Sequence, residues 1–323
     1  MPLSMQEHLD AIVEAAQDDD RGHVPPVPIS VETGERQPFG IAVASTRGDL
    51  WCAGDTDITF PLQSISKAVV YAMVLEEHGF EAVEKAVDIE PSGESYDAIS
   101  VEDGTGRPDN PMINAGAMTV HAMIGGPDAD VKERDERIVE VFSKLAGHRL
   151  EIDEHVFEYE FGASHRNLAI AHMLRALEVL PDEPEDVVRG YLRQCAVSAT
   201  TADLAMIGAT LANAGTNPRT GERVFSPAVV RQALSVMMTC GMYDSAGDWV
   251  SEVGIPAKSG VSGGILGVVP GRGGICTFAP RLDEHGNSVR GQLAYERLSD
   301  ELGLHFVDAL HEEDHRWEDA IRA

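Results

Sequence analysis

The strongest restriction on the fold comes from the order of two hydrophobic periods along the chain. Short apolar segments punctuated by Gly and Pro, typical of β-strands, lie near both ends, at residues 39–54 and 255–279. Between them, from Ser64 to about Gly241, apolar residues recur at helical spacing. That order predicts an α+β chain in which both ends build one sheet and the middle forms a helical insertion.

The predicted elements divide the chain into two lobes. Residues 1–65 and 220–323 are expected to form a discontinuous sheet-containing lobe, residues 66–219 are expected to form a helical lobe, and a site is expected between them. The predicted strands are 39–45, 49–54, 255–260, 264–269 and 274–279, and the predicted helices are 64–78, 131–146, 167–180, 201–214, 226–240 and 288–301.

Charge limits the classes of partner. The 54 acidic residues outnumber the 25 basic ones, so the net charge is −29. Such a chain repels nucleic acid and anionic membranes, and it motivates the hypothesis that the protein tolerates salt. No run approaches the roughly 18 apolar residues of a membrane span, and the first 20 residues are acidic rather than signal-like. We therefore expect a soluble cytoplasmic protein that binds neither nucleic acid nor membranes.

Cysteine spacing gives no indication of a metal or disulfide framework. The four cysteines are widely scattered and form no C-x-x-C pair, so they are interpreted as buried or semi-buried thiols. The positions are Cys52, Cys195, Cys240 and Cys276.

An S-x-x-K motif at residues 64–67 gives the first indication of catalytic chemistry. Ser64 and Lys67 are three residues apart at a helix start, so they share one helical face. The positive end of the helix dipole and partial desolvation both favour a neutral lysine there, which can accept a serine proton. Alone the motif is weak, because Ser64 as a helix cap with Lys67 on a solvated face explains it equally well.

A second motif strengthens the first. Lys258, Ser259 and Gly260 form a K-S-G triplet on a predicted strand. In S-x-x-K acyl-transfer enzymes such a strand lines the pocket, and its glycine lets substrate approach the backbone. A glycine-rich strand edge would explain the glycines of this region but not the lysine.

Together with the segments between them, these motifs resemble the glutaminase family of β-lactamase-like enzymes. The resemblance implies a serine β-lactamase-like fold, an antiparallel sheet flanked by helices with an inserted all-helical lobe. It also implies hydrolysis of L-glutamine to L-glutamate and ammonia, no cofactor, no metal, and a homodimer or homotetramer. The segments occur in family order at 60–67, 90–93, 110–117, 160 with 166–167, 191–195, 239–244, 256–265 and 286–291.

The resemblance also implies a role for each matching residue. Ser64 would attack the side-chain amide carbonyl, Lys67 would take its proton, and Lys258 would lie on the pocket strand. Tyr191 and Tyr243 would relay a proton to the leaving ammonia, and either could be the main shuttle.

Substrate binding is implied at further positions. Glu160 would hold the α-ammonium group, and Asn114 and Asn167 would bond the rest of the amino-acid head. The N–H groups of Ser64 and Val261 would form an oxyanion hole. The implied substrate-binding residues are Gln63, Ser64, Asn114, Glu160, Asn167, Tyr191, Tyr243 and Val261.

One departure concerns a lid. The family usually carries a Tyr-Ile-Pro segment near the N-terminus whose tyrosine closes over glutamine. This chain has a proline-rich segment at 24–28 instead, and its first tyrosine is Tyr71. The lid contact is therefore expected to be absent or supplied by another residue.

Three other functions compete with this interpretation. Residues 311–315 match H-E-x-x-H, a zinc signature, but they lie in an acidic tail close to the chain end, where a solvated helical face explains them better. A β-lactam-binding acyl enzyme would not need Glu160 and Asn167 to hold a zwitterion. A non-catalytic binding protein would not need the serine and both lysines.

Overall fold

The structure is a computed structural model that describes residues 3–25, 37–93, 100–102, 104–127, 129–308 and 315–323. Its α-helices are α1 Met5–Ala16, α2 Ser66–His78, α3 Phe80–Ala86, α4 Asn114–Met123, α5 Val131–Ala146, α6 Glu154–Gly162, α7 His165–Ala176, α8 Pro184–Cys195, α9 Thr201–Ala212, α10 Pro227–Cys240, α11 Ala246–Glu252, α12 Val289–Leu302 and α13 Arg316–Ala320. Two 3₁₀ helices, η1 Gln63–Ile65 and η2 Tyr243–Ser245, precede α2 and α11.

A five-stranded antiparallel sheet joins the two ends of the chain. Its order is β2-β1-β8-β7-β6, so β1 from the N-terminal region pairs directly with β8 from the C-terminal region. The prediction of one sheet built from both ends is therefore confirmed. The strands are β1 Gly40–Ser45, β2 Leu50–Gly54, β6 Ala257–Ser259, β7 Gly264–Val269 and β8 Gly273–Phe278, and a small second sheet contains β3 Phe60–Pro61, β5 Val197–Ala199 and β4 Glu151–Ile152.

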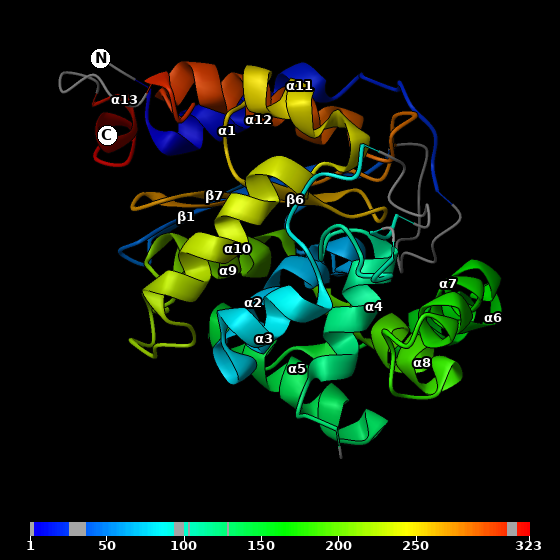
Figure 1. Ribbon diagram of the computed structural model, residues 1–323. Helices are drawn as coiled ribbons and strands as arrows, with labels where there is room; N and C mark the ends of the chain where they lie inside the picture. Colours follow the sequence, from blue (N-terminus) through cyan, green and yellow to red (C-terminus); the bar gives the residue numbers. More distant parts are fainter. Residues whose placement is uncertain (1–2, 26–36, 94–99, 103, 128, 309–314) are drawn as a thin grey trace.

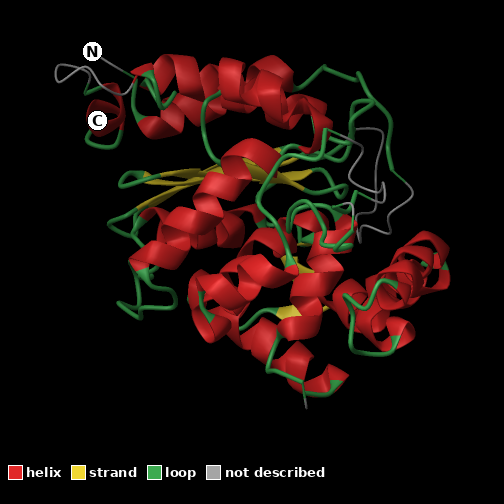
Figure 2. Ribbon diagram, viewed as in Figure 1, coloured by secondary structure: helices red, strands yellow, loops and turns green. Residues whose placement is uncertain are grey.

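Helices cover both faces of the large sheet, as Figure 2 shows. Helices α1, α11 and α12 lie over one face, and α9 and α10 lie over the other (Figure 1). Alternating side chains follow this arrangement: Ile41 and Val43 belong to the core under α1 and α12, whereas Ala42 and Ala44 belong to the core under α9. Because both faces are buried, the strands contain apolar runs rather than alternation with polar residues.

Helix α9 lies unusually close to the sheet because glycines meet at the contact. A Cβ atom on Gly208 would lie 2.7 Å from the Cα atom of Gly274, and one on Gly274 would lie 2.3 Å from the backbone of Ala205 and Ala209. Larger residues at either glycine would force the helix off the sheet. The division at 65/66 and 219/220 into two lobes stays a prediction.

Several helix bounds differ from the sequence-based expectation by two residues or more. The helix predicted over 167–180 ends at Ala176, because Glu178 adopts a left-handed φ of 63° and the N–H groups of Val179 and Leu180 turn back to the carbonyl of Leu174. The first turn of the helix predicted from Ser64 is a separate 3₁₀ turn, and α2 itself starts at Ser66.

Every helix in the described ranges is too short or too polar to cross a lipid bilayer. The expected cytoplasmic location stays a prediction.

Candidate active site

Ser64 lies in the tight turn η1, which leads from the small sheet into α2. Gln63, the preceding residue, is buried and has a left-handed φ of 49°. That conformation costs a non-glycine residue roughly 1–2 kcal/mol, so surrounding contacts must maintain it. The hydroxyl of Ser66 donates one such contact, a 2.7 Å hydrogen bond to the carbonyl oxygen of Gln63. Backbone strain of this kind is typical of functional sites.

The K-S-G strand meets this turn. A Cβ atom on Gly260 would lie 2.8 Å from the carbonyl oxygen of Leu62 and 3.6 Å from Cβ of Gln63. Gly260 therefore permits the end of β6 to lie against the turn that carries Ser64. The two motifs, almost 200 residues apart in sequence, are brought together.

Lys67 is buried rather than solvated, with 2% of its surface exposed. Its Nζ atom donates to the carbonyl oxygen of Met112 at 3.0 Å and to Oδ1 of Asn114 at 2.7 Å. Burial lowers the pKa of this amine to about 8. A neutral amine has two N–H donors and one lone pair, so the two oxygen acceptors leave the lone pair free to accept a proton.

Asn114 connects this lysine to the residues expected to bind substrate. As the first residue of α4, it accepts from Lys67 and, at 3.3 Å, from the hydroxyl of Tyr191 on α8. Its amide nitrogen donates to Oδ1 of Asn167 on α7 at 3.0 Å. Burial raises the pKa of the Tyr191 phenol well above its ordinary value, so the hydroxyl keeps its proton. The structure thus brings Lys67, Asn114, Asn167 and Tyr191 into one connected group.

Lys258 and Tyr243 form a second connected pair. The Nζ atom of Lys258 donates to the carbonyl oxygens of Gly241 at 2.9 Å and Ser259 at 2.8 Å, and it lies 4.2 Å from the centre of the Tyr243 ring. The Tyr243 hydroxyl donates to the carbonyl of Ser259 at 3.1 Å. Burial, and then the charge of Lys67, lower the pKa of Lys258 well below its ordinary value. The two lysines are therefore close enough to interact electrostatically.

Glu160 on α6 contacts the strained residue before Ser64. Nε2 of Gln63 donates to Oε1 of Glu160 at 3.3 Å. Burial raises the pKa of this carboxyl, and the hydrogen bond from Gln63 acts against that rise. A partly desolvated carboxylate with a single amide partner can still accept bonds from an ammonium group.

Ser64 and Val261 are the residues whose N–H groups are expected to serve as oxyanion donors. In the turn after β6, the N–H groups of Gly260 and Gly263 bond to backbone carbonyls. Among the backbone bonds of turns, loops and caps in the described residues, none has the N–H group of Val261 or Ser64 as its donor. Val261 lies near Tyr243, because a Cβ atom on Gly286 would be within 4 Å of both side chains.

A cavity of about 390 Å³ lies beside Tyr243 and Met112. Residues from three segments line it, 91–93, 110–113 and 239–250, and they include Tyr243 and the Lys67 partner Met112. The first two segments, together with 239–244, belong to the stretches on which the family resemblance was based.

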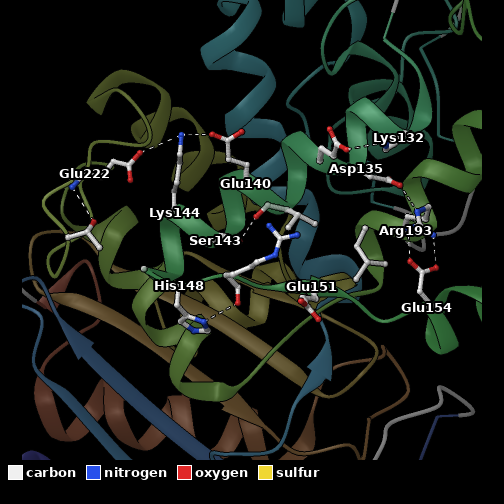
Figure 3. Close-up of a pocket in the computed structure, with 16 residues that line it drawn as sticks. Lys132, Asp135, Glu140, Ser143, Lys144, His148, Glu151, Glu154, Arg193 and Glu222 are labelled. Carbon is white, nitrogen blue, oxygen red and sulfur yellow. Dashed lines mark hydrogen bonds and ion pairs between the residues drawn. The ribbon is translucent and has the colours of Figure 1, made fainter.

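A larger cavity, of about 800 Å³, lies elsewhere, beside α5 (Figure 3). It contains none of the predicted site residues. Its basic side chains are largely paired with carboxylates: Lys144 with Glu140 and Glu222, and Arg193 with Asp135 and Glu154. Size alone therefore does not identify the reactive site.

Sequence reasoning missed several groups that touch the site. The carbonyl of Met112 is a backbone atom and has no sequence signal. Gln194 and Cys195 are buried about one helical turn after Tyr191, and burial raises the pKa of the Cys195 thiol to about 11. Their place in the 191–195 segment was the only available indication.

Two sequence features cannot be placed. Residues 311–314 of the H-E-x-x-H match and residues 26–28 of the proline-rich segment lie outside the described residues. The solvated-face interpretation of the H-E-x-x-H match and the expected absence of the lid contact stay predictions.

Comparisons with known proteins agree on one family. The family model described as Glutaminase matches residues 22–306. A glutaminase of Corynebacterium glutamicum is 46% identical over 307 residues, which make up 95% of this chain and 74% of that protein. A glutaminase of Microcystis aeruginosa is 45% identical over 272 residues, covering 84% of this chain and 80% of that protein.

Solved structures resemble the fold over nearly the whole chain. A crystal structure described as Mglu in its native form superposes with a TM-score of 0.90 at 48% identity, covering 96% of this chain and 75% of that chain. A Bacillus glutaminase crystallised in the presence of 4.3 M NaCl superposes with a TM-score of 0.85 at 36% identity, covering 92% of this chain and 98% of that chain.

Proposed function

This chain belongs to the glutaminase family of amidohydrolases, and from that membership we propose that it hydrolyses L-glutamine through an acyl-enzyme on Ser64. The observation that carries the mechanism is the environment of Lys67. Its amine is buried, has a lowered pKa, and has oxygen acceptors for both N–H groups of its neutral form. It is one helical turn from the serine hydroxyl.

In the first step the neutral Lys67 amine takes the proton of the Ser64 hydroxyl. The serine oxygen forms a bond to the side-chain amide carbon of glutamine, and the negative charge that develops on the carbonyl oxygen is stabilised by the N–H groups of Ser64 and Val261. One such donor contributes about 2.7–4 kcal/mol in comparable sites.

In the second step the C–N bond breaks and ammonia leaves. The leaving nitrogen takes a proton through a phenol, and the proton on Lys67 replaces the one that the phenol gives. Tyr191, bonded to Asn114, and Tyr243, beside Lys258, are both placed near a buried lysine. Water then cleaves the ester, which yields glutamate and restores the serine.

The polar groups beside the lysine suit the amino-acid head of the substrate. Glu160 would bind the α-ammonium group in place of its present bond from Gln63, and Asn114 and Asn167 would bond the remaining polar atoms. These groups favour a free zwitterion over a β-lactam or a peptidoglycan stem. They also set the expectation that glutamine is preferred over the shorter asparagine.

The test is ammonia release from glutamine and from asparagine by the parent protein and by Ser64→Ala. We expect release from glutamine to exceed that from asparagine and to disappear in the variant. Unchanged release by Ser64→Ala would refute the mechanism, and faster turnover of asparagine would refute the substrate. Acylation by a penicillin at a rate above glutamine turnover would favour the β-lactam alternative instead.

We further propose a homodimer or homotetramer in the cytoplasm that needs no cofactor and binds neither nucleic acid nor membranes. The net charge of −29 supports the last point and also supports tolerance to salt. Sedimentation in low and molar salt tests the assembly, and a steep loss of activity in molar salt would contradict the tolerance.

A further inference from the structure

We propose that a buried chain of hydrogen bonds, running from His121 through Gln194 and Ser66 to the carbonyl oxygen of Gln63, positions Ser64 for attack. The chain crosses three helices, α4, α8 and α2, behind the site. This inference rests on the proposed role of Ser64 as nucleophile, and it assigns positioning functions to His121, Gln194 and Ser66, none of which lines the cavity of about 390 Å³.

The geometry of the chain is continuous. Nδ1 of His121 lies 3.0 Å from Oε1 of Gln194, Nε2 of Gln194 donates to Oγ of Ser66 at 3.1 Å, and that hydroxyl donates to the carbonyl of Gln63 at 2.7 Å. The three side chains are at most 1% exposed. Buried polar side chains are costly unless they are hydrogen-bonded, so each link supports the next.

The donors all point in one direction. Because the amide nitrogen of Gln194 donates to Ser66, its oxygen must accept, and His121 then donates from Nδ1 as the neutral tautomer. Burial lowers the pKa of this imidazole to about 4, which agrees with a neutral ring. The Ser66 hydroxyl accepts from Gln194 and is thereby oriented to donate to Gln63.

The His121 ring fits into the core against a glycine of the neighbouring helix α8. A Cβ atom on Gly190 would lie 2.3 Å from Nε2 of His121, so α8 leaves room for the ring only because it carries glycine there. Within the described residues, Nε2 has no hydrogen-bond partner. An unpartnered buried nitrogen is tolerated more easily as a lone pair than as an N–H donor of a charged ring.

The last hydrogen bond of this network, from Ser66 to the carbonyl of Gln63, shows how the network can position Ser64. The carbonyl of Gln63 and the N–H of Ser64 belong to one planar trans peptide, so they point in opposite directions. A bond that holds the carbonyl therefore also fixes the direction of the Ser64 N–H, which is the expected oxyanion donor. The left-handed φ of Gln63 makes such support necessary, because the residue would otherwise relax.

The experiment compares Ser66→Ala with Ser299→Ala. Ser299 is a matched control: it is 2% exposed, and its hydroxyl donates to the carbonyl of Val253 at the same 2.7 Å, on α12. Gln194→Met tests the chain at a second position and serves if Ser66→Ala folds poorly. Glutamine kinetics and thermal unfolding are measured for each single variant and for the double variant that combines Ser66→Ala with Gln194→Met.

We expect Ser66→Ala and Gln194→Met each to lower kcat by about 10- to 100-fold, the size of effect that small misplacements of reacting groups produce. KM should stay within about twofold, because the substrate contacts are not altered. The double variant should be little worse than either single one, since the two changes break the same chain. Ser299→Ala should lower the melting temperature while kcat stays at the parent value.

Three results would overturn the inference. A parent-like kcat in both Ser66→Ala and Gln194→Met would remove it while leaving the nucleophile in place. Equal losses of kcat in Ser66→Ala and Ser299→Ala would show a general effect of destabilisation. If Ser64→Ala, assayed in parallel, keeps full activity, the proposed function fails, and the positioning role falls with it.

Discussion

Basic side chains have opposite partners and opposite pKa shifts in the region around Ser64 and in the cavity beside α5. Around Ser64, two lysines are buried among carbonyl oxygens and an aromatic ring, and the pKa of each is lowered. Beside α5, Lys144 and Arg193 are bonded to carboxylates, and their pKa values are raised. Figure 3 shows these ion pairs among the residues that line the cavity.

The charge of the hydrogen-bond partner decides whether a buried basic side chain can act as a base. A carbonyl oxygen can satisfy an N–H donor without compensating a full positive charge, so burial favours the neutral amine. A carboxylate does compensate that charge and keeps the proton in place. Only the first arrangement yields a side chain that can accept a proton at physiological pH.

The largest effect is expected when the proton acceptor is replaced by a permanent cation. Lys67→Arg introduces a long side chain that stays protonated and cannot accept the serine proton, so kcat should fall by about 10³-fold. Lys144→Arg makes the same change in the paired cavity, where no proton transfer is proposed, and should leave kcat within about twofold. Steady-state kinetics on glutamine checks both variants. A Lys67→Arg variant with parent-like kcat would show that Lys67 is not the proton acceptor.

A carboxylate placed beside Lys67 should turn the first environment into the second. In Asn114→Asp, the oxygen now 2.7 Å from Nζ carries a negative charge. Opposite charges this close shift a pKa by about 1–3 units, so Lys67 should stay protonated and kcat near neutral pH should fall by about 100-fold. Part of the loss should return at higher pH. A pH-independent loss would instead indicate that only a substrate contact was removed.

The parent enzyme should show the titration itself. With a pKa of about 8, the neutral and active form of Lys67 increases as the pH rises. One unit below the pKa, roughly a tenth of the lysine is neutral, so kcat/KM should rise about tenfold from pH 7 to a plateau above pH 9. A profile that is flat over this range would contradict a lysine base with this pKa.

The smallest effect is expected in the paired cavity. Glu222→Gln removes one of two carboxylates that contact Lys144, at a distance of 3.5 Å and with both side chains substantially exposed. Such pairs contribute at most about 1 kcal/mol, and salt screens them. Urea unfolding should show a small loss of stability that vanishes in high salt, and glutamine turnover should not change.

Helices with clear local start and stop signals were the part of the fold best predicted from the sequence. Helix α5 has the predicted bounds, because its Asp130 cap, its apolar stripe and Gly147 are all local signals. Among the helices that were not predicted, α4 is almost wholly buried and has no polar face, whereas α1 and α8 have apolar stripes that were overlooked. The early end of α7 depends on a left-handed Glu178, which no sequence rule requires.

For the site, local spacing was enough to identify Ser64 and Lys67 as partners, since residues three apart on a helix share a face whatever surrounds them. The charge state of Lys67 could not be obtained in that way. It depends on desolvation and on the acceptors Met112 and Asn114, which are 45 and 47 residues distant in the chain. The hydrogen bond from Gln194 to Ser66 joins residues that are 128 positions apart in the sequence. Covalent neighbours are fixed by the polymer, whereas electrostatic surroundings exist only after distant segments have packed together.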